Sequence, residues 1–535
     1  EVAVMALGAV GFLLHSIETL FIALFLGGVQ SALFGPVKYA ILPQQLADHE
    51  LVGGNALVET GTSIAILLGM VAGGWMVGQP GWGVAGVAIG TIAISGLGYA
   101  LSRWIPRAPA AEPDIAVKWN PLTETWRIFG FVRANRTVFL SVLGVSWLWF
   151  FGSMLVTQLP NLSRNVLGGD EHVVTLLLIV FSVGLGAGSL MCERLSGHKI
   201  EIGLVPFGSI GLTLFAVDLY FALQGFGGGT RAGVAEFVST AGAWRVLADL
   251  SLIGAFGGVY LVPLYALIQS RSAASHRSRV IAGNNVLNAL FMVAAALIAI
   301  ALFHFGFTIP QLILATALAN AAVALYIYTL VPEFLMRFLA WLLIHSVYRL
   351  DKSGLDNIPE RGPAVLVCNH VSYVDALVIA AACPRPIRFV MHQDIFRIPV
   401  LKFFFRTSRA IPIASARENA ALLERAYDDI AAALERGELI GIFPEGRITD
   451  TGELYPFRPG IRRIIARTPV PVVPMALRGL WGSFFSRKGG PAMTKPFRRG
   501  ILSKIALAVG RSVPADCATP EALQGEVRAL RGDWK

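Results

Sequence analysis

Charged side chains are scarce in this sequence. Only 15% of its 535 residues are Asp, Glu, Lys or Arg, whereas 55% are hydrophobic, and the mean hydropathy is +0.63. This composition excludes a chain that is water-soluble throughout and is typical of a membrane protein. Cysteine is also rare: the four residues form no C-x-x-C pair, which argues against a disulfide framework or a thiolate metal site. We therefore expect reduced core cysteines and no bound metal.

The scarcity of charge is not uniform along the chain. Residues 1–332 carry 15 basic and 15 acidic side chains, whereas residues 333–535 carry 29 and 19, so the whole net charge of +10 lies in the second part. A basic part beside a membrane favours contact with anionic lipid headgroups. No recognised nucleic-acid-binding motif accompanies this charge, so we expect no nucleic-acid partner.

The N-terminus lacks the basic start and the cleavage site of a signal peptide. Its first apolar run ends at Leu14, which is short of the roughly 20 residues needed to cross a bilayer. We interpret this run as a helix cut by truncation. Nine longer apolar segments follow, and a polar connection at 105–136 leaves four helices before it and six after it. The nine segments lie near 19–42, 53–78, 83–104, 137–158, 172–191, 202–222, 247–269, 280–303 and 309–331.

Loop charges predict the orientation of this all-α membrane bundle. When the connection at 105–136 is placed in the cytoplasm, most of the other basic loop residues fall on the same side, as the positive-inside rule requires. Residues beyond Pro332 are then cytoplasmic. The stretch 333–350 is too short to cross the membrane and too apolar for a solvated linker, so we expect a linker helix in the membrane interface.

Strand and helix patterns alternate in the last part of the chain, which predicts an α/β domain at 351–535 with a mixed or parallel sheet. In such sheets, sites lie at the carboxyl ends of the strands. The expected strands are 364–368, 387–391, 438–443 and 470–474. One helix is expected directly after Ser372 and another at 418–436.

The expected strand at 364–368 breaks at a polar pair, Asn369-His370, and His370 lies five residues before Asp375. On an ideal helix these positions are about 140° apart, so ring and carboxylate meet only if His370 precedes the first turn. A carboxylate bonded to one ring nitrogen fixes the tautomer and leaves the other nitrogen as a general base. The alternative is structural, because Ser372 to Asp375 also match the S-x-x-D pattern of a helix cap.

A second polar motif, Pro444-Glu-Gly-Arg447, directly follows the expected strand at 438–443. N-H-x-S-x-x-D followed by F-P-E-G-R, in this order and spacing, resembles the glycerophospholipid acyltransferase family of the 1-acylglycerol-phosphate acyltransferase type. The resemblance implies direct transfer of an acyl group from a thioester to the hydroxyl of a lysolipid, with His370 as the base and Asp375 orienting it. No bound cofactor is implied, and the acyl thioester, on acyl carrier protein or coenzyme A, is a co-substrate.

The same resemblance implies a site for the acceptor. The guanidinium of Arg447 is a planar fork that matches phosphate, and a glycine before it lets the backbone approach closely. The residues expected to bind substrate are Asn369, Ser372, Glu445, Gly446 and Arg447.

Two positions depart from that family's pattern. Its members commonly carry a lysine where this chain has His392, and an arginine where it has Ala414, so the contacts with acceptor phosphate at these positions stay open. The basic stretch Arg487–Lys504 fits two partners, lipid headgroups or an acidic acyl carrier protein.

The membrane part has a resemblance of its own. A ten-helix bundle divided four and six by a central linker resembles a twelve-helix major facilitator transporter without its first two helices. The segments Gln30–Pro43 and Glu50–Glu59 resemble the lysophospholipid transporter family of that superfamily. Lys38 and Glu59 lie inside apolar helices, where charge is costly, so they are candidates for the transport pathway. Structural ion pairs or snorkelling side chains are the alternative.

Taken together, the resemblances imply a bacterial fusion in the cytoplasmic membrane. A transporter domain at 1–332 brings lysophospholipid to the cytoplasmic leaflet, and an acyltransferase domain at 351–535, on the cytoplasmic side, restores the missing acyl chain of the lipid. One alternative is a lysophosphatidic acid acyltransferase of phospholipid synthesis fused to an unrelated transporter. The other is a transporter whose soluble domain is inactive.

Overall fold

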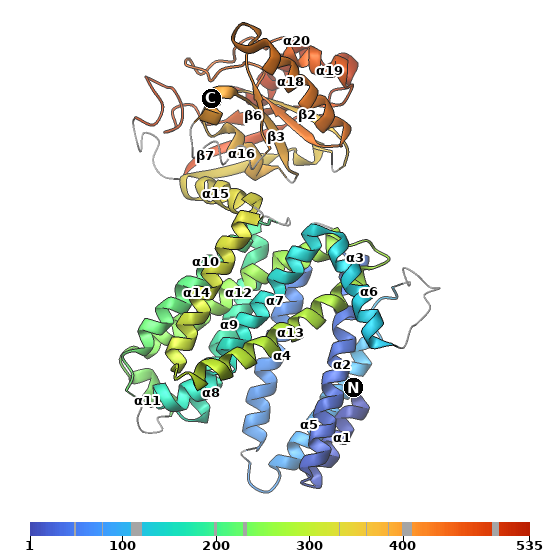
Figure 1. The fold of residues 1–535 in the computed structure, drawn as a ribbon, viewed down its shortest axis with the longest axis vertical. Coiled ribbons are helices and arrows are strands. Elements are labelled where there is room, and N and C mark those ends of the chain that lie inside the picture. The colour runs from blue at the N-terminus through green and yellow to red at the C-terminus, as the bar shows by residue number, and fades with distance from the viewer. Residues whose placement is uncertain are drawn as a thin grey trace. The chain divides into compact units, whose positions relative to one another are not determined.

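The computed structural model describes residues 1–47, 50–77, 79–108, 120–196, 201–227, 233–330, 332–359, 361–383, 385–397, 409–494 and 502–534. The chain forms two compact units, Glu1–Ile327 and Tyr328–Lys535 (Figure 1). The boundary therefore falls slightly before the expected one at 332. We call them the first and the second unit.

The first unit is helical. Within the described residues, nine helices are long and apolar enough to cross a membrane, which confirms the predicted segments. A shorter apolar helix, α1 (Val2–Leu13), precedes them. The nine are α2 (Ile17–Ala40), α4 (Leu51–Val77), α5 (Gly83–Ser102), α7 (Arg136–Val156), α9 (Glu171–Ser196), α10 (Leu204–Leu223), α12 (Ala243–Arg271), α13 (Arg277–His304) and α14 (Ile309–Leu330).

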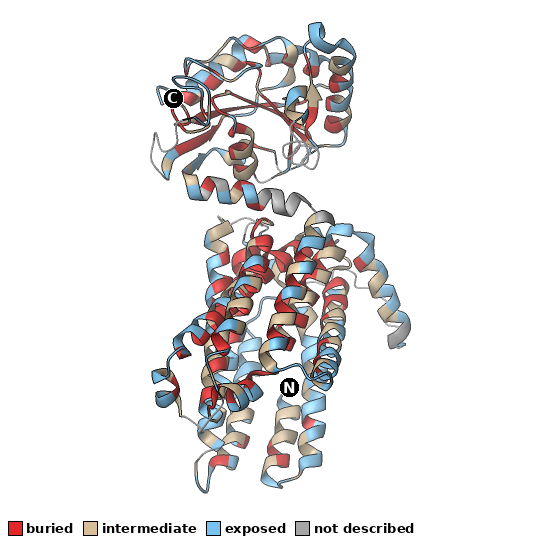
Figure 2. Cartoon of the chain, turned by 60° about the vertical axis from the view of Figure 1, so that its left-hand side comes forward, coloured by how far each residue is buried: buried red, intermediate tan, exposed pale blue. Residues whose placement is uncertain are grey.

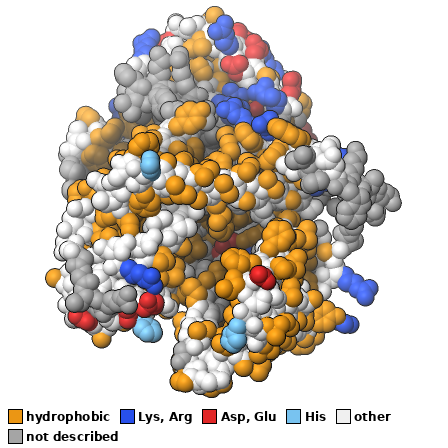
Figure 3. Space-filling model, turned by 60° about the horizontal axis from the view of Figure 1, so that its bottom comes forward, with side chains coloured by type: hydrophobic (Ala, Val, Ile, Leu, Met, Phe, Trp, Pro, Cys, Tyr) orange, Lys and Arg blue, Asp and Glu red, His pale blue; other side chains and the backbone are white. Residues whose placement is uncertain are grey.

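Helix α12 is the centre of this unit. In its most apolar stretch 78% of α12 is buried, against 6% for α2 with its short continuation α3 (Leu42–Gln45). Figure 2 shows the buried residues concentrated along the inward faces of the helices, with exposed residues on the outward faces. Many of the outward residues are large and hydrophobic, such as Phe25, Leu68 and Ile89. Hydrophobic side chains accordingly dominate the face drawn in Figure 3, which is hollowed between helices.

The polar connection between the fourth and fifth helices contains structure that the sequence analysis missed. Helix α6 (Pro121–Ala134) occupies its second half, where residues 105–136 had been treated as a linker. Arg127 and Arg279 both lie against the ring of Phe131, at 5.9 and 5.3 Å from its centroid. Two other short helices, α8 (Leu159–Leu162) and α11 (Val234–Ser239), lie between spanning helices.

Glycines form the contact between α9 and α12. A Cβ atom on Gly184 or Gly188 of α9 would lie 2.1 or 1.9 Å from a main-chain oxygen of α12, and one on Gly254 or Gly258 of α12 would lie 2.2 or 2.5 Å from a main-chain oxygen of α9. Each helix thus presents a G-x-x-x-G pair to the other. Such small-residue faces let membrane helices pack backbone to backbone.

The second unit is a seven-stranded mixed sheet between helices (Figure 1), in the order β1-β7-β6-β2-β5-β3-β4. Only β6 and β7 pair antiparallel among the described strands. The predicted mixed α/β fold is confirmed, although β1, β4, β7 and two helices were missed. The strands are β1 (Tyr348–Ser353), β2 (Ala364–Cys368), β3 (Ile387–His392), β4 (Ile411–Ile413), β5 (Leu439–Ile442), β6 (Val472–Arg478) and β7 (Ser503–Val509).

Side chains alternate between the two faces of the sheet and form two hydrophobic cores. Leu366 of β2 belongs to the core beneath α15 and α16, whereas Val365 and Val367 belong to the core beneath α18, α19 and α20. A period of two is expected for a central strand buried on both sides. The helices are α15 (Pro332–Val347), α16 (Asp375–Ala382), α18 (Ala416–Glu435), α19 (Gly460–Arg467) and α20 (Pro520–Arg531).

The linker expectation at 333–350 needs one correction. A helix is present, but α15 ends at Val347 and the chain enters β1 at Tyr348, which pairs with β7. Tyr348 and Leu350 point to the same face of β1 and pack in the sheet core. This burial stabilises the strand over a continuation of the helix. Whether α15 lies in a membrane interface stays a prediction.

The glycine contact between α9 and α12 generates a stability prediction. Gly188→Ala places a methyl group against the Ala255 carbonyl, and overpacking of this kind typically costs about 1–3 kcal/mol. The thermal unfolding midpoint of the purified chain in detergent is expected to fall. Gly61→Ala on α4 is the matched control, because a Cβ there meets nothing within 4 Å and alanine is the better helix former. Equal midpoints for the two variants would contradict the packing argument.

Candidate active site

The two polar motifs meet at one edge of the sheet. Strands β2 and β5 are parallel neighbours, with Val367 opposite Ile442, so the segments that follow them leave the sheet side by side. This is the carboxyl edge at which α/β proteins commonly place their sites. The sequence analysis predicted both motifs to lie at strand ends, and the pairing of β2 with β5 brings the two ends together.

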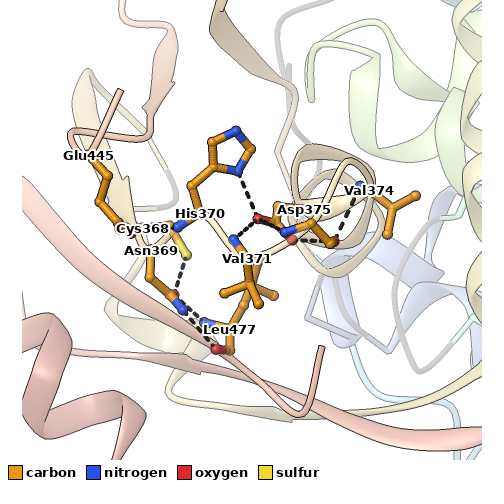
Figure 4. Close-up of polar contacts among 9 residues, drawn as sticks. Cys368, Asn369, His370, Val371, Val374, Asp375, Glu445 and Leu477 are labelled. Carbon is orange, nitrogen blue, oxygen red and sulfur yellow. Dashed lines mark hydrogen bonds and ion pairs between the residues drawn. The ribbon is translucent and has the colours of Figure 1, made fainter. Parts of the chain in front are cut away.

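The ring of His370 contacts the carboxylate of Asp375. His370 lies between β2 and α16, and its Nδ1 is 2.9 Å from Asp375 Oδ2. Helix α16 begins at Asp375, so the ring precedes the first turn and folds back, as the predicted contact requires. Figure 4 shows Nδ1 facing the carboxylate and the other ring nitrogen directed away from it.

The structural alternative for Asp375 also holds in part. Its Oδ2 accepts hydrogen bonds from the backbone N–H groups of Val371 and Ser372 at 2.5 and 2.9 Å, and its Oδ1 accepts from Ser372 Oγ at 2.6 Å. The carboxylate is fully buried. One residue therefore closes the turn before α16 and orients the imidazole, so capping and ring orientation are not exclusive.

An aromatic column supports the other side of the imidazole. The ring of Phe443, directly after β5, stacks on His370 with centroids 4.3 Å apart and planes 16° apart, and Phe389 of β3 lies beyond it. The His370 side chain keeps 21% of its surface exposed. Its Nε2 bonds to no group in the part of the chain that the structure describes. Asp375 thus holds the imidazole at one nitrogen and Phe443 packs on its face.

Glu445 braces the backbone of the site. Its Oε1 accepts from the N–H of His370 and its Oε2 from the N–H of Tyr455, both at 2.8 Å, and the side chain is buried. Burial raises the pKa of Glu445 to about 7, although both N–H donors oppose the shift. Main-chain donors occupy both oxygens, so Glu445 positions the backbone of the site, and its expected contact with substrate stays a prediction.

Arg447 lies on a loop that is fastened to His370 at two points. The His370 N–H bonds to Glu445, and its carbonyl accepts from the N–H of Thr449 at 2.9 Å. Arg447 lies between these anchors and is exposed. Its guanidinium carbon lies 3.9 Å from the centroid of the Tyr455 ring. A cation–π contact of this kind holds the guanidinium while its N–H groups stay available.

Asn369 and Ser372 are buried, and their polar atoms bond within the protein. Asn369 joins β2 to β6, donating to the Leu477 carbonyl at 3.0 Å and accepting from its N–H at 2.8 Å (Figure 4). Ser372 is fully buried, and its hydroxyl donates to Asp375. These contacts give both residues a structural role, and their expected substrate-binding role stays a prediction.

The sequence analysis missed Arg458 and Tyr455. Gly446 has φ +69°, and a Cβ there would lie 2.7 Å from the Arg458 guanidinium. Arg458 is exposed and its side chain makes no ion pair within the described residues, so a second guanidinium stands beside the F-P-E-G-R loop. The sequence signal that could have pointed to Arg458 is the F-R-P-G run at 457–460, a few residues after the loop. His392 stands where the resembled family commonly has a lysine. Its ring contacts the carboxylates of Asp394 and Glu418.

The two transport candidates lie in the first unit. Glu59 of α4 is buried and accepts a hydrogen bond from Tyr39 Oη of α2. Tyr39 stacks on Tyr265 of α12 at 4.6 Å. Lys38 donates to Thr62 at 3.4 Å and lies 4.7 Å from the Tyr39 ring centroid, and no ion pair joins it to Glu59 within the described residues. The structure thus brings both side chains to one tyrosine, and their role in transport stays a prediction.

Comparison with known proteins assigns a family model to each part. Residues 2–243 match the Major Facilitator Superfamily model, and residues 349–478 match the Acyltransferase model. The chain carries a Major Facilitator Superfamily domain followed by an Acyltransferase domain. The second match spans β1 to β6 and contains both polar motifs. With nine apolar helices in the described residues, the protein is a multi-pass membrane protein.

Curated relatives match the first part of the chain. The lysophospholipid transporter LplT of Klebsiella pneumoniae is 28% identical over 256 residues, and that of Serratia proteamaculans is 31% identical over 264 residues. Each match covers 48% of this chain and 59% of the relative, so the chain spans about three-fifths of the length of these transporters. Among solved structures, the 1-acyl-sn-glycerophosphate acyltransferase PlsC of Thermotoga maritima is 20% identical, covering 38% of this chain and 76% of its own, with a TM-score of 0.30.

The raised pKa of Glu445 predicts a pH dependence of stability. The folded pKa is about 7 and the ordinary value is 4.5, so the folded state binds this proton more tightly than the unfolded state. The stabilisation is complete below pH 4.5 and is lost as the pH rises through about 7.

Melting temperatures of the purified chain between pH 4.5 and 8 test this. The wild type is expected to lose stability with rising pH more steeply than Glu445→Gln, which cannot titrate. The Gln variant also lacks one acceptor oxygen, so its melting temperature is expected to be lower at every pH. Parallel profiles for the two proteins would refute the assigned pKa.

Proposed function

We propose that the protein takes up lysophospholipid from the membrane and reacylates it on the cytoplasmic side. The observation that carries the enzymatic half is the ring of His370, fixed by buried Asp375 at Nδ1 while Nε2 is left without a partner among the described residues. The Acyltransferase family match over residues 349–478 supports the reaction class. The intact pair argues against an inactive soluble domain.

The proposed chemistry is a direct transfer in a ternary complex. Nε2 of His370 removes the proton from the free hydroxyl of the lysolipid as the oxygen attacks the thioester carbonyl carbon. The tetrahedral intermediate collapses with cleavage of the C–S bond, and the imidazolium returns the proton to the leaving thiolate. Asp375 stabilises the imidazolium between these steps, because its carboxylate already contacts Nδ1.

The acceptor is held by its phosphate in this proposal. Arg447 is exposed, lies on the loop anchored to His370, and carries the N–H fork that matches phosphate oxygens. Arg458 adds a second positive charge on the other side of Gly446. The acyl donor is a thioester of acyl carrier protein or coenzyme A. Exposed Arg487 and Lys488 suit either an acidic carrier protein or lipid headgroups.

The transport half rests on different observations. The relatives that match residues of the first unit are lysophospholipid transporters, and the Tyr39–Glu59 pair places a carboxylate inside apolar helices. A protein that delivers a lysolipid to the leaflet where an acyltransferase works keeps a detergent-like intermediate from accumulating. We place the protein in the bacterial cytoplasmic membrane with the acyltransferase domain facing the cytoplasm.

Acyl transfer is tested by substitution of the proposed base. His370→Ala is expected to lower the rate with acyl-thioester donor and lysophosphatidylethanolamine by about 10²–10⁴-fold, the usual contribution of a general base. Asp375→Asn is expected to cause a loss of similar size, because an amide that donates to Nδ1 leaves the proton on Nε2. Asp429→Asn is the control, since it changes an exposed side chain of α18 in the same unit. Unchanged transfer in His370→Ala would remove the proposed base.

Transport is tested separately in the same vesicles. Glu59→Gln is expected to lower uptake of labelled lysophosphatidylethanolamine about tenfold, because a buried intramembrane carboxylate is lost, while acyl transfer to lysolipid supplied on the cytoplasmic side persists. His370→Ala is expected to show the reverse pattern. If Glu59→Gln leaves uptake intact, the carboxylate has only a structural role with Tyr39.

A further inference from the structure

The loop that carries Arg447 also carries an acidic side chain, Asp450. Both residues contact Tyr455 from different directions. The guanidinium of Arg447 lies over the face of the ring, 3.9 Å from its centroid, while the ring hydroxyl donates a hydrogen bond to Asp450 Oδ1. No ion pair joins Arg447 to Asp450 among the described residues. The tyrosine therefore holds a cation and an anion close together without letting them neutralise each other.

The carboxylate of Asp450 is available and charged. The side chain is exposed. The hydrogen bond from Tyr455 lowers the pKa of Asp450, and the positive charges of Arg447 and Arg487 lower it further. Thr449, its neighbour in the chain, donates its N–H to the His370 carbonyl, so the carboxylate lies on a segment fastened to the proposed base. Asp450 and Arg447 thus lie on one loop and contact the same tyrosine ring.

We infer that Asp450 binds the ammonium group of a zwitterionic lysophospholipid whose phosphate is held by Arg447. This inference rests on the proposed acyl transfer and adds the headgroup class: a phosphodiester that ends in a primary amine. An ammonium group offers three donors to a carboxylate, and the hydroxyl of Tyr455 occupies only one of its two oxygens.

The same carboxylate disfavours a bare phosphate. A phosphomonoester carries about −1.5 to −2 charge at neutral pH, so an anion beside the phosphate position repels it more strongly than it repels a phosphodiester with one negative charge. Attraction to the amine and repulsion of the monoester act in the same direction. The arrangement thus favours lipid remodelling over acylation of lysophosphatidic acid.

The test compares two acceptors with the full chain. Initial rates are measured on lysophosphatidylethanolamine and on lysophosphatidic acid at low ionic strength, because exposed charges are screened by salt. Asp450→Asn is expected to lower the ratio of the first kcat/KM to the second by about fivefold, the size expected for an exposed charge pair. Asp429→Asn is the matched control, since it removes an exposed aspartate from α18.

Two further variants separate binding from structure. Tyr455→Phe removes the hydroxyl that holds Asp450 but keeps the ring beneath Arg447, so the preference for the amine is expected to persist. Asp450→Lys is expected to reverse the preference. Equal losses on both acceptors in Asp450→Asn, or an unchanged ratio, would overturn the inference.

Failure of the proposed acyl transfer is distinguishable from failure of this subsite. The first appears as absence of any His370-dependent transfer to either lysolipid. The subsite is then decided by calorimetric titration of the full-length His370→Ala chain with water-soluble glycerophosphoethanolamine and with glycerol 3-phosphate. Asp450→Asn in that background is expected to weaken binding of the first relative to the second. An unchanged relative affinity would overturn the ammonium subsite independently of catalysis.

Discussion

The buried carboxylate of Asp375 is the interaction on which the site depends. It accepts hydrogen bonds from two backbone N–H groups and one hydroxyl, and its fourth contact is the ring of His370. A buried carboxylate is costly unless such donors compensate it. The donors exist only when the chain turns sharply between β2 and α16, and that turn also brings His370 over the carboxylate. Folding of the turn and orientation of the base are therefore the same event.

Much of the architecture could be predicted because its signals are local. Nine long apolar segments predict spanning helices by length alone, and β2 and β5 are short apolar runs that end at polar motifs. Other elements carried no such signal. Strand β7 and helices α19 and α20 combine charged and apolar residues in short pieces, and their inward faces are defined only by the sheet that they cover. Helix α6 was hidden by the polar composition of its connection.

The site was predictable to the extent that its chemistry follows from residue type. The five-residue spacing of His370 and Asp375, together with the strand end, was enough to anticipate their contact. Asn369, Ser372 and Glu445 were expected to face substrate because they belong to the motifs, yet Ser372 donates to the Asp375 side chain, and the polar atoms of Asn369 and Glu445 pair with main-chain groups. Those pairings depend on β6 and on the loop at 445–455, which lie far away in sequence. Tyr455 and Arg458 were missed for the same reason.

The glycine contact between α9 and α12 has a mechanical consequence for the first unit. Two backbones that touch along paired glycines leave little room for side chains between them, so the two helices are held at a fixed separation. Sliding one helix along the other would bring larger side chains against the facing backbone, so we expect the two helices to move together. Helix α2, with little of its surface covered, packs mainly against α1 and α13, and Tyr39 near its end adds a hydrogen bond to Glu59 of α4 and a stacked contact with Tyr265 of α12.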